Sequence, residues 1–190
     1  KFMKQKILSS VLIAVALLAA LPANAYDFMV KGIAYNITSN GTVEVTHRGS
    51  YKYSGDIIIP SSVTYEGTTY SVTTIGEDAF MSCLNLTSVI IPNSITAIGN
   101  SAFSACGFTT ITIPNSVITI GNSAFAGCLG LTSVTIPNSV TAIGEDAFEM
   151  CSGLTSVIIP NSVTVIGERA FAACDGLISI LVESGNTVYD

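Results

Sequence analysis

Five cysteines recur at nearly constant intervals along this 190-residue chain, and their spacing could serve disulfide formation, metal binding or plain packing. Successive members are 23, 22, 23 and 23 residues apart: Cys83, Cys106, Cys128, Cys151 and Cys174. Regularly placed cysteines suggest disulfides if the protein is exported, but five is an odd number. A column of thiols cannot surround a metal ion tetrahedrally, whereas it suits a packed column of small apolar side chains. We therefore expect free, buried thiols and no metal or other cofactor.

Two pairs of adjacent acids, Glu77-Asp78 and Glu145-Asp146, are candidates for general acid–base catalysis or calcium binding. Equivalent positions elsewhere hold Asn-Ser or Glu-Arg, and acids at the start of a helical turn also suit the helix dipole. We expect a structural role for both pairs. His47 is the one histidine in the sequence, and the chain has no nucleophile motif or Gly-rich phosphate loop. The sequence therefore predicts no catalytic residue, and we do not expect an enzyme.

The elements that position these residues come from an internal repeat. Four units of 22 or 23 residues begin at Leu86, Phe108, Leu131 and Leu154 and share the pattern Leu-x-x-Val-x-Ile-Pro-x-Ser-Val-x-x-Ile-Gly-x-x-Ala-Phe-x-x-Cys. In a repeat array each unit buries its apolar side only against its neighbours, so a single unit does not fold alone. The pattern therefore predicts a solenoid.

The fourth unit shows the elements expected in each coil. Residues 154–159 have the β-branched content of a short strand that ends at Pro160. Asn161 and Ser162 then turn the chain, residues 163–166 form a second extended segment, and residues 168–174 suit one helical turn. We expect an α/β repeat solenoid, right-handed, with a parallel strand ladder and short helical turns.

Two further columns follow from the repeat. The phenylalanines should form a stacked aromatic spine in the core, and the asparagines after each proline should form turns, although they could instead line a ligand groove. The columns are Phe80, Phe103, Phe125, Phe148 and Phe171, and Asn93, Asn115, Asn138 and Asn161.

The ends of the array depart from the pattern. Residues 26–53 read as a β-rich N-terminal cap, with a hairpin of residues 33–38 and 42–47. The solenoid is expected over residues 54–190. Its first repeat carries an inserted hairpin, residues 63–65 and 69–72, and its last repeat, from Leu177, is incomplete, so we expect a longer parent protein.

Residues 1–25 resemble a secretory signal peptide. Lys1, Lys4 and Lys6 precede an apolar run over residues 7–21, and Ala23-Asn24-Ala25 fits a cleavage site. We expect export to the cell surface or the extracellular space, with no membrane insertion after cleavage. The remaining chain has four basic and 13 acidic residues, a net charge of 4 − 13 = −9. This charge disfavours nucleic acid and anionic membrane surfaces as partners.

The repeat units resemble the BspA-like family of leucine-rich repeats. The resemblance is carried by units such as Leu131-Thr-Ser-Val-Thr-Ile-Pro-Asn-Ser-Val-Thr-Ala-Ile-Gly-Glu-Asp-Ala-Phe-Glu-Met-Cys151, and the segment Tyr53-Ser-Gly-Asp-Ile-Ile-Ile-Pro60 is also similar to that family. The resemblance implies a curved solenoid on a bacterial surface or secreted protein. It also implies partners among host or neighbouring-cell molecules, extracellular-matrix and plasma proteins included. It supplies no catalytic residue.

One set of positions is not required for folding. The outward residues of the first strand of each coil form a field of hydroxyl and isoleucine side chains without charge, and we expect them to bind an extracellular protein or glycan. The candidate binding residues are Thr87, Ser88, Ile90, Thr110, Thr112, Ser133, Thr135, Ser156 and Ile158. The alternative is a structural spacer that displays another domain of a longer surface protein.

Overall fold

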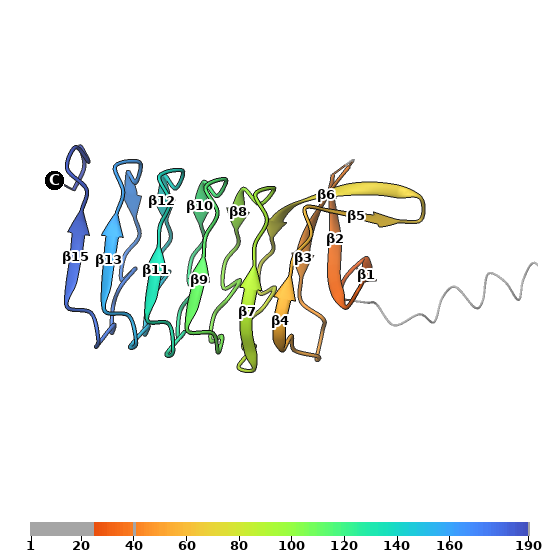
Figure 1. Cartoon of the computed structure of the whole chain (residues 1–190), viewed down its shortest axis with the longest axis horizontal. Coiled ribbons are helices and arrows are strands. Elements are labelled where there is room, and N and C mark those ends of the chain that lie inside the picture. Colours follow the sequence, from red (N-terminus) through yellow and green to blue (C-terminus); the bar gives the residue numbers. More distant parts are fainter. Residues whose placement is uncertain (1–24, 40, 190) are drawn as a thin grey trace, which may run out of the picture.

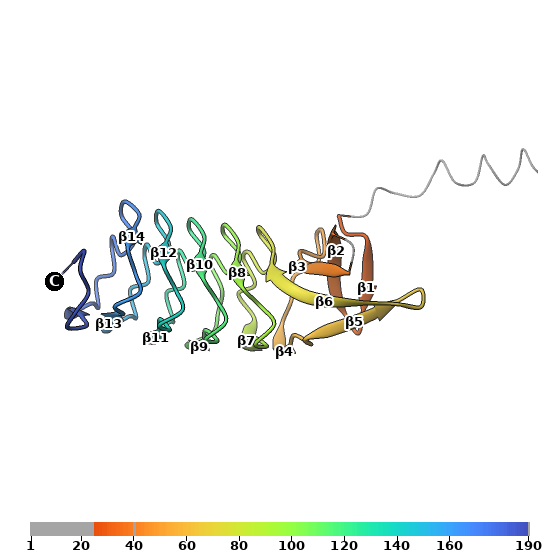
Figure 2. The ribbon, with the colours of Figure 1, turned by 90° about the horizontal axis from the view of Figure 1, so that it is seen from above.

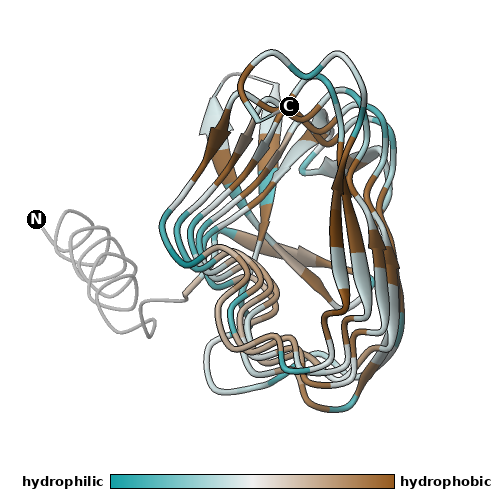
Figure 3. Ribbon diagram, turned by 90° about the vertical axis from the view of Figure 1, so that its left-hand side faces the viewer, coloured by the Kyte–Doolittle hydropathy of each residue, from teal (hydrophilic) through white to brown (hydrophobic). Residues whose placement is uncertain are grey.

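The computed structural model describes residues 25–39 and 41–189. The predicted signal peptide therefore lies outside the described residues, apart from Ala25. The chain forms a β-solenoid whose coils stack side by side along one axis (Figure 1). Viewed down that axis, the coils superimpose, and the hydropathy of each position repeats from coil to coil (Figure 3). Among the described residues, no helix is long and apolar enough to cross a bilayer.

The first strand of each coil contributes to one side of the solenoid, which we call the front ladder. Its strands run parallel and pair in twos, β4 with β7, β9 with β11 and β13 with β15. The bounds are β4 (Gly55–Ile58), β7 (Leu86–Ile90), β9 (Thr110–Thr112), β11 (Ser133–Thr135), β13 (Ser156–Ile159) and β15 (Ser179–Val182). The predicted parallel strand ladder is thus confirmed.

The second extended segments form the opposite side, the back ladder (Figure 2). Parallel pairing runs from β3 through β6, β8, β10 and β12 to β14. Their bounds are β3 (Thr42–Thr46), β6 (Thr68–Ile75), β8 (Ala97–Ile98), β10 (Thr119–Ile120), β12 (Ala142–Ile143) and β14 (Val165–Ile166). At the N-terminal end, β1 (Phe28–Val30), β2 (Ile33–Ser39) and β3 pair antiparallel in that order. The inserted segment pairs β5 (Ser62–Tyr65) with β6 as a protruding antiparallel hairpin.

The predicted short helical turns are wrong, because the described residues contain no helix. In the segment after each Ile-Gly, two residues four positions apart have positive φ, as Asp146 (56°) and Met150 (57°) do. The N–H groups of Asp146, Phe148 and Met150 donate to carbonyls of the next coil at 3.0, 2.8 and 2.8 Å. An α-helix would direct those groups to carbonyls four residues back in the same coil. Stacking between coils therefore replaces the helix with a run of tight turns.

The phenylalanine column forms the predicted aromatic spine. Adjacent rings stack with centroids 5.1–5.4 Å apart and interplanar angles of 2–9°. Tyr53 extends the spine at the cap, with its ring 4.7 Å from that of Phe80. Its hydroxyl donates to the carbonyl of Thr46 and accepts from the N–H of Ala34. Tyr53 thereby joins the cap to the core of the first coil.

The asparagine column lies at the predicted turns. The residue two positions after each asparagine donates its N–H to the preceding proline's carbonyl, as Val140 does to Pro137 at 3.0 Å. Three of the four intervening serines, Ser94, Ser116 and Ser139, link coils, as Ser139 Oγ does by donating to the carbonyl of Val117 at 2.6 Å. These contacts confirm that the asparagines form turns.

The five cysteines are free thiols, and all but the partly exposed Cys174 are buried. Each thiol from the second coil onward donates to the phenylalanine carbonyl of the preceding coil, as Cys128 Sγ does to Phe103 at 3.1 Å. The column thus contributes hydrogen bonds between coils as well as packing, in agreement with the expected free, buried thiols.

Burial of these thiols predicts a loss of stability at alkaline pH. Burial raises the pKa of Cys128 to about 11, whereas the thiol of an unfolded chain has a pKa of about 8.5. A raised folded-state pKa contributes stability that is fully present below the unfolded pKa and is lost as pH rises toward the folded pKa. We expect the free energy of unfolding, measured with urea, to fall as pH rises from about 8.5 toward 11.

The matched variant for this prediction is Cys128→Ala, in which the free energy of unfolding should fall less steeply from pH 8 to 10. Buried Tyr35 and Tyr53 have pKa values raised to about 12, and unfolded tyrosine ionises near pH 10. Ionisation of these tyrosines therefore lowers the free energy of unfolding mainly above pH 10. Equal slopes for the wild type and the variant would contradict the assignment.

Candidate functional site

The outer face of the front ladder brings together the residues that the sequence predicted. Seven of the nine lie in two parallel columns on β9, β11, β13 and the end of β7, and all seven are exposed: Ile90, Thr110, Thr112, Ser133, Thr135, Ser156 and Ile158. Within these columns Thr110 lies opposite Ser133, and Thr112 lies opposite Thr135. We call this surface the front face.

The core does not use these side chains. The residues between them point inward, and Val89, Ile111, Val134 and Val157 are at most 8% exposed. A strand alternates the directions of successive side chains, so each inward valine or isoleucine leaves its neighbours on the outside. The front face therefore consists of side chains that contribute little to burial.

The remaining two predicted residues, Thr87 and Ser88, are already engaged by the protein. A shift in register between β4 and β7 places Asp56 opposite Ser88 and leaves Thr87 without a partner position. Both hydroxyls donate to Asp56 Oδ1, at 2.6 Å from Ser88 and 2.7 Å from Thr87. These bonds lower the pKa of the Asp56 carboxyl. Thr87 and Ser88 thus serve this carboxylate and are less available to a ligand than the other seven.

The structure adds two residues that sequence reasoning missed. Ile58 lies opposite Ile90, and Leu181 lies opposite Ile158. Their side chains are 66% and 57% exposed. They lengthen the second column, so the exposed apolar side chains lie toward its ends and the threonines in its middle. The repeated Ile-Ile-Pro of residues 58–60 was a signal that could have placed Ile58 there.

A shallow cavity of about 280 Å³ lies on the front face between β11 and β13. It is lined by four predicted residues, Ser133, Thr135, Ser156 and Ile158, together with Val134, Ile136 and Glu183. The Glu183 carboxylate accepts a hydrogen bond from the N–H of Asn161 at 3.2 Å. The cavity thus combines three hydroxyls, one carboxylate and aliphatic surface, which can hydrogen-bond and pack against a ligand but supply no nucleophile and base in contact.

The acid pair Glu145-Asp146 lies on a different part of the coil, where Asp146 has a structural contact. Arg169 donates two hydrogen bonds to Asp146, from Nε at 2.8 Å and from a terminal nitrogen at 2.7 Å. These hydrogen bonds from Arg169 lower the pKa of the Asp146 carboxyl. The carboxylate therefore links neighbouring coils. Among residues 25–39 and 41–189, no three His, Cys, Asp or Glu side chains are grouped to hold a metal ion.

Comparison with known proteins identifies a repeat family and solved structures that this chain resembles. A family model described as the BspA type leucine rich repeat region matches residues 73–190 with six copies. A leucine-rich repeat protein from Bacteroides ovatus is 37% identical, with a TM-score of 0.77, over 85% of this chain and 45% of its own. The T. pallidum leucine rich repeat protein is 30% identical, with a TM-score of 0.71, over 80% of this chain and 70% of its own. A leucine-rich repeat protein from Bacteroides capillosus is 31% identical, with a TM-score of 0.52, over 82% of this chain and 97% of its own.

The chain thus spans less than half the length of the B. ovatus protein. No curated protein matches it closely enough to count as a relative. The six repeat copies cover well over half of the chain and coincide with the stacked coils of the structure. The chain belongs to the BspA-type leucine-rich-repeat family.

Proposed function

We propose that this chain is an exported leucine-rich-repeat binding module that adheres to an extracellular protein or glycan through its front face. The observation that carries the proposal is the continuity of the two outward columns across successive coils, on positions that the core does not use. Repeat solenoids commonly bind through such extended surfaces. The target would belong to a host or a neighbouring cell.

The chemistry of the front face suits adhesion. The central threonine and serine hydroxyls can donate and accept hydrogen bonds. Ile58, Ile90, Ile158 and Leu181 are large apolar side chains that remain more than half exposed, and exposed apolar surface of this kind marks interaction sites. The acidic chain, with a formal net charge of −6 over its full length, favours targets that are neutral or basic.

Four substitutions test this proposal together: Ile90, Thr112, Thr135 and Ile158, each to Glu. Because all four side chains are exposed, we expect the fold to survive. Affinity for the target should fall at least about tenfold, because binding would bury the introduced carboxylates in contacts made for hydroxyl and apolar side chains. The measurement is binding of the purified chain to immobilised extracellular-matrix and plasma proteins and to a glycan array.

The matched control carries the same four charges on the back ladder. Thr96, Ile118, Thr141 and Thr164 occupy one exposed column there, linked by hydrogen bonds from each N–H to the carbonyl one coil before. Their replacement by Glu should leave binding intact. Equal loss in both variants would contradict a front-face site, and a chain that binds no target in these assays would favour the spacer alternative.

A further inference from the structure

The front ladder has an open edge at β4. Among the described residues, β4 pairs only with β7, whereas the cap strands β1, β2 and β3 extend the back ladder beyond β6. The cap therefore closes one side of the solenoid and leaves the other side without a covering strand. An unpaired strand edge presents main-chain donors and acceptors that can pair with another chain.

The direction of the main-chain groups can be assigned from their partners. Gly55 donates its N–H to the Asn85 carbonyl at 2.8 Å, and Ile59 donates to the Ile90 carbonyl at 3.0 Å. Main-chain groups of successive strand residues point to opposite edges. The N–H and C=O groups of Asp56 and Ile58 therefore point away from β7, toward the open edge.

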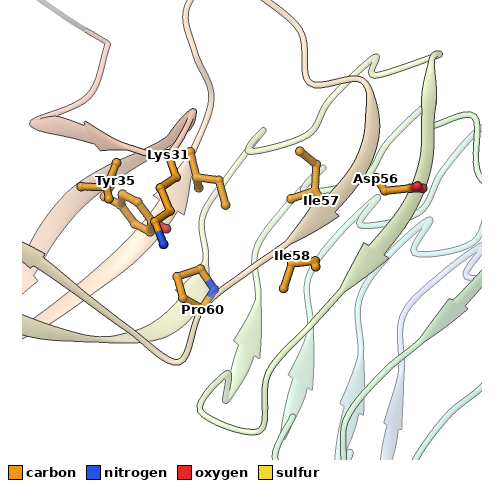
Figure 4. Close-up of a pocket in the computed structure, with 8 residues that line it drawn as sticks. Lys31, Tyr35, Asp56, Ile57, Ile58 and Pro60 are labelled. Carbon is orange, nitrogen blue, oxygen red and sulfur yellow. The ribbon is translucent and has the colours of Figure 1, made fainter.

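A cavity of about 320 Å³ lies beside this edge. Val30, Lys31, Ile33 and Tyr35 line it from the hairpin of β1 and β2, and the rest of the lining comes from the opposite side (Figure 4): Asp56, Ile57, Ile58 and Pro60. Its lining is mainly apolar, and its volume is at the small end of ligand pockets, roughly 300–1,000 Å³. It can accommodate one large or two small side chains of a bound segment.

Lys31 provides an uncompensated positive charge at this cavity. It is exposed in the turn between β1 and β2, where its φ is 48°, and its side chain makes no hydrogen bond or ion pair with another described residue. Its amino group lies near Pro60, whereas the Asp56 carboxylate is turned away toward β7 (Figure 4). The cavity thus combines an apolar lining with a cation that lacks a partner.

We propose that an extended peptide segment binds along the open edge of β4, with one apolar side chain in the cavity and a carboxylate beside Lys31. The peptide would pair with the main-chain groups of Asp56 and Ile58 as an added strand. The carboxylate is either the free C-terminus of the peptide or an acidic side chain, since both give the same charge-assisted hydrogen bond. This site adjoins the front face at Ile58, but it does not depend on the function proposed for that face.

The length of the edge favours a peptide over a second copy of the chain. β4 contains four residues, so one added strand buries far less than the roughly 800 Å² per partner found in stable protein pairs. Two copies of an acidic chain would also repel each other. A short segment with a local carboxylate matches what the site offers.

The test uses fluorescein-labelled hexapeptides that alternate threonine with valine, isoleucine, leucine or phenylalanine. Each is made with a free C-terminal carboxylate, with a terminal glutamate amide, and with a terminal glutamine amide. Fluorescence anisotropy with the purified chain should show binding of a carboxylate form, and the glutamine amide should bind roughly tenfold more weakly. N-methylation of alternate peptide nitrogens should weaken binding by a further factor of about ten or more, because it removes the main-chain donors.

Variants of the chain locate the site. Ile58→Pro removes the N–H at the open edge but leaves the bond from Ile59 to β7, whereas Ile58→Ala retains that N–H and loses only the side chain. We expect a large loss of peptide binding for the first and a small one for the second. Lys31→Asn, which tolerates a positive φ, should abolish the preference for a carboxylate. Circular dichroism melts verify that each variant is folded.

Two results would overturn the proposal: N-methylated and unmethylated peptides that bind equally to the unaltered chain, or no carboxylate peptide bound at about 1 mM. Both use the wild-type protein, so a misfolded Ile58→Pro variant does not affect them. Dimers seen by sedimentation velocity and dissociated by Ile58→Pro would assign the edge to a second copy instead. Thr112→Glu combined with Thr135→Glu should retain peptide binding, which separates this site from the front face.

Discussion

Gly144→Ala is expected to lower the free energy of unfolding by about 3 kcal/mol, at the upper end of the range for overpacked interiors. A Cβ atom on Gly144 would lie 2.5 Å from the main-chain nitrogen of Asn122 and 2.5 Å from the carbonyl carbon of Gly121. Both atoms belong to the backbone of the preceding coil, which cannot rotate away as a side chain can. The substitution would therefore push two coils apart where Gly144 N–H donates to the Ile120 carbonyl at 2.8 Å.

The control for this prediction is Gly130→Ala. The nearest atom to a Cβ at Gly130 would be the carbonyl oxygen of Phe108 at 3.7 Å, an ordinary contact distance. We expect a change within about 0.5 kcal/mol, as for most surface substitutions. Urea unfolding followed by circular dichroism measures both variants. If the two glycines prove equally replaceable, close approach between coils is not the reason for the glycine in each Ile-Gly pair.

The columns of inward-pointing side chains were predictable from the sequence because they all recur with the same repeat of 22 or 23 residues. Residues one repeat apart occupy equivalent positions in adjacent coils. The recurrence of phenylalanine at the position of Phe125, and of cysteine at the position of Cys128, in each repeat therefore already implied stacked columns. Alternation along the first strand likewise implied that Thr112 and Thr135 point outward. Each of these inferences needs only the repeat and the geometry of a strand.

The helical turns were not predictable in this way. The segment Glu168-Arg-Ala-Phe-Ala-Ala-Cys174 has residues compatible with a helix, and its composition does not reveal where its N–H groups go. In the equivalent segment one coil earlier, alternate N–H groups donate to carbonyls of this segment, which are available only after stacking, as Phe148 does to Ala170. Tertiary hydrogen bonding therefore overrides local propensity at this position in the four coils that have a following coil stacked on them.

The details of the candidate sites also depended on contacts between distant residues. The carboxylate of Asp56 meets Thr87 and Ser88 because of a single register shift that no repeat pattern encodes. The cavity beside β4 joins Lys31 of the cap to Pro60 of the first coil, and the cap does not follow the repeat. Sequence reasoning therefore located the front face but not its engaged hydroxyls or the second cavity.

Phe125→Ala is expected to destabilise the chain by about 3–5 kcal/mol, the usual range for truncation of a buried phenylalanine. The Phe125 ring is fully buried and stacks on both neighbours, with centroids 5.4 Å from Phe103 and 5.1 Å from Phe148. Truncation leaves a cavity and removes two aromatic contacts at once. Each coil is stabilised mainly by its immediate neighbours, so the loss weakens both interfaces of the central coil.

Two comparisons separate the stack from simple loss of apolar surface. Phe125→Leu keeps most of the buried volume but removes the stacked ring, and we expect it to cost about 1–2 kcal/mol. Leu129→Ala, a truncation in the same repeat at a side chain that is 63% exposed, should change stability by less than about 0.5 kcal/mol. Because weakened interfaces in the middle of an array allow its two halves to unfold separately, Phe125→Ala should also broaden the urea transition and lower its apparent m-value. The opposite outcome is a urea transition whose midpoint shifts while its m-value stays that of the wild type. The coils on either side of Phe125 would then remain coupled through their backbone hydrogen bonds, and the aromatic spine would contribute to stability without governing cooperativity.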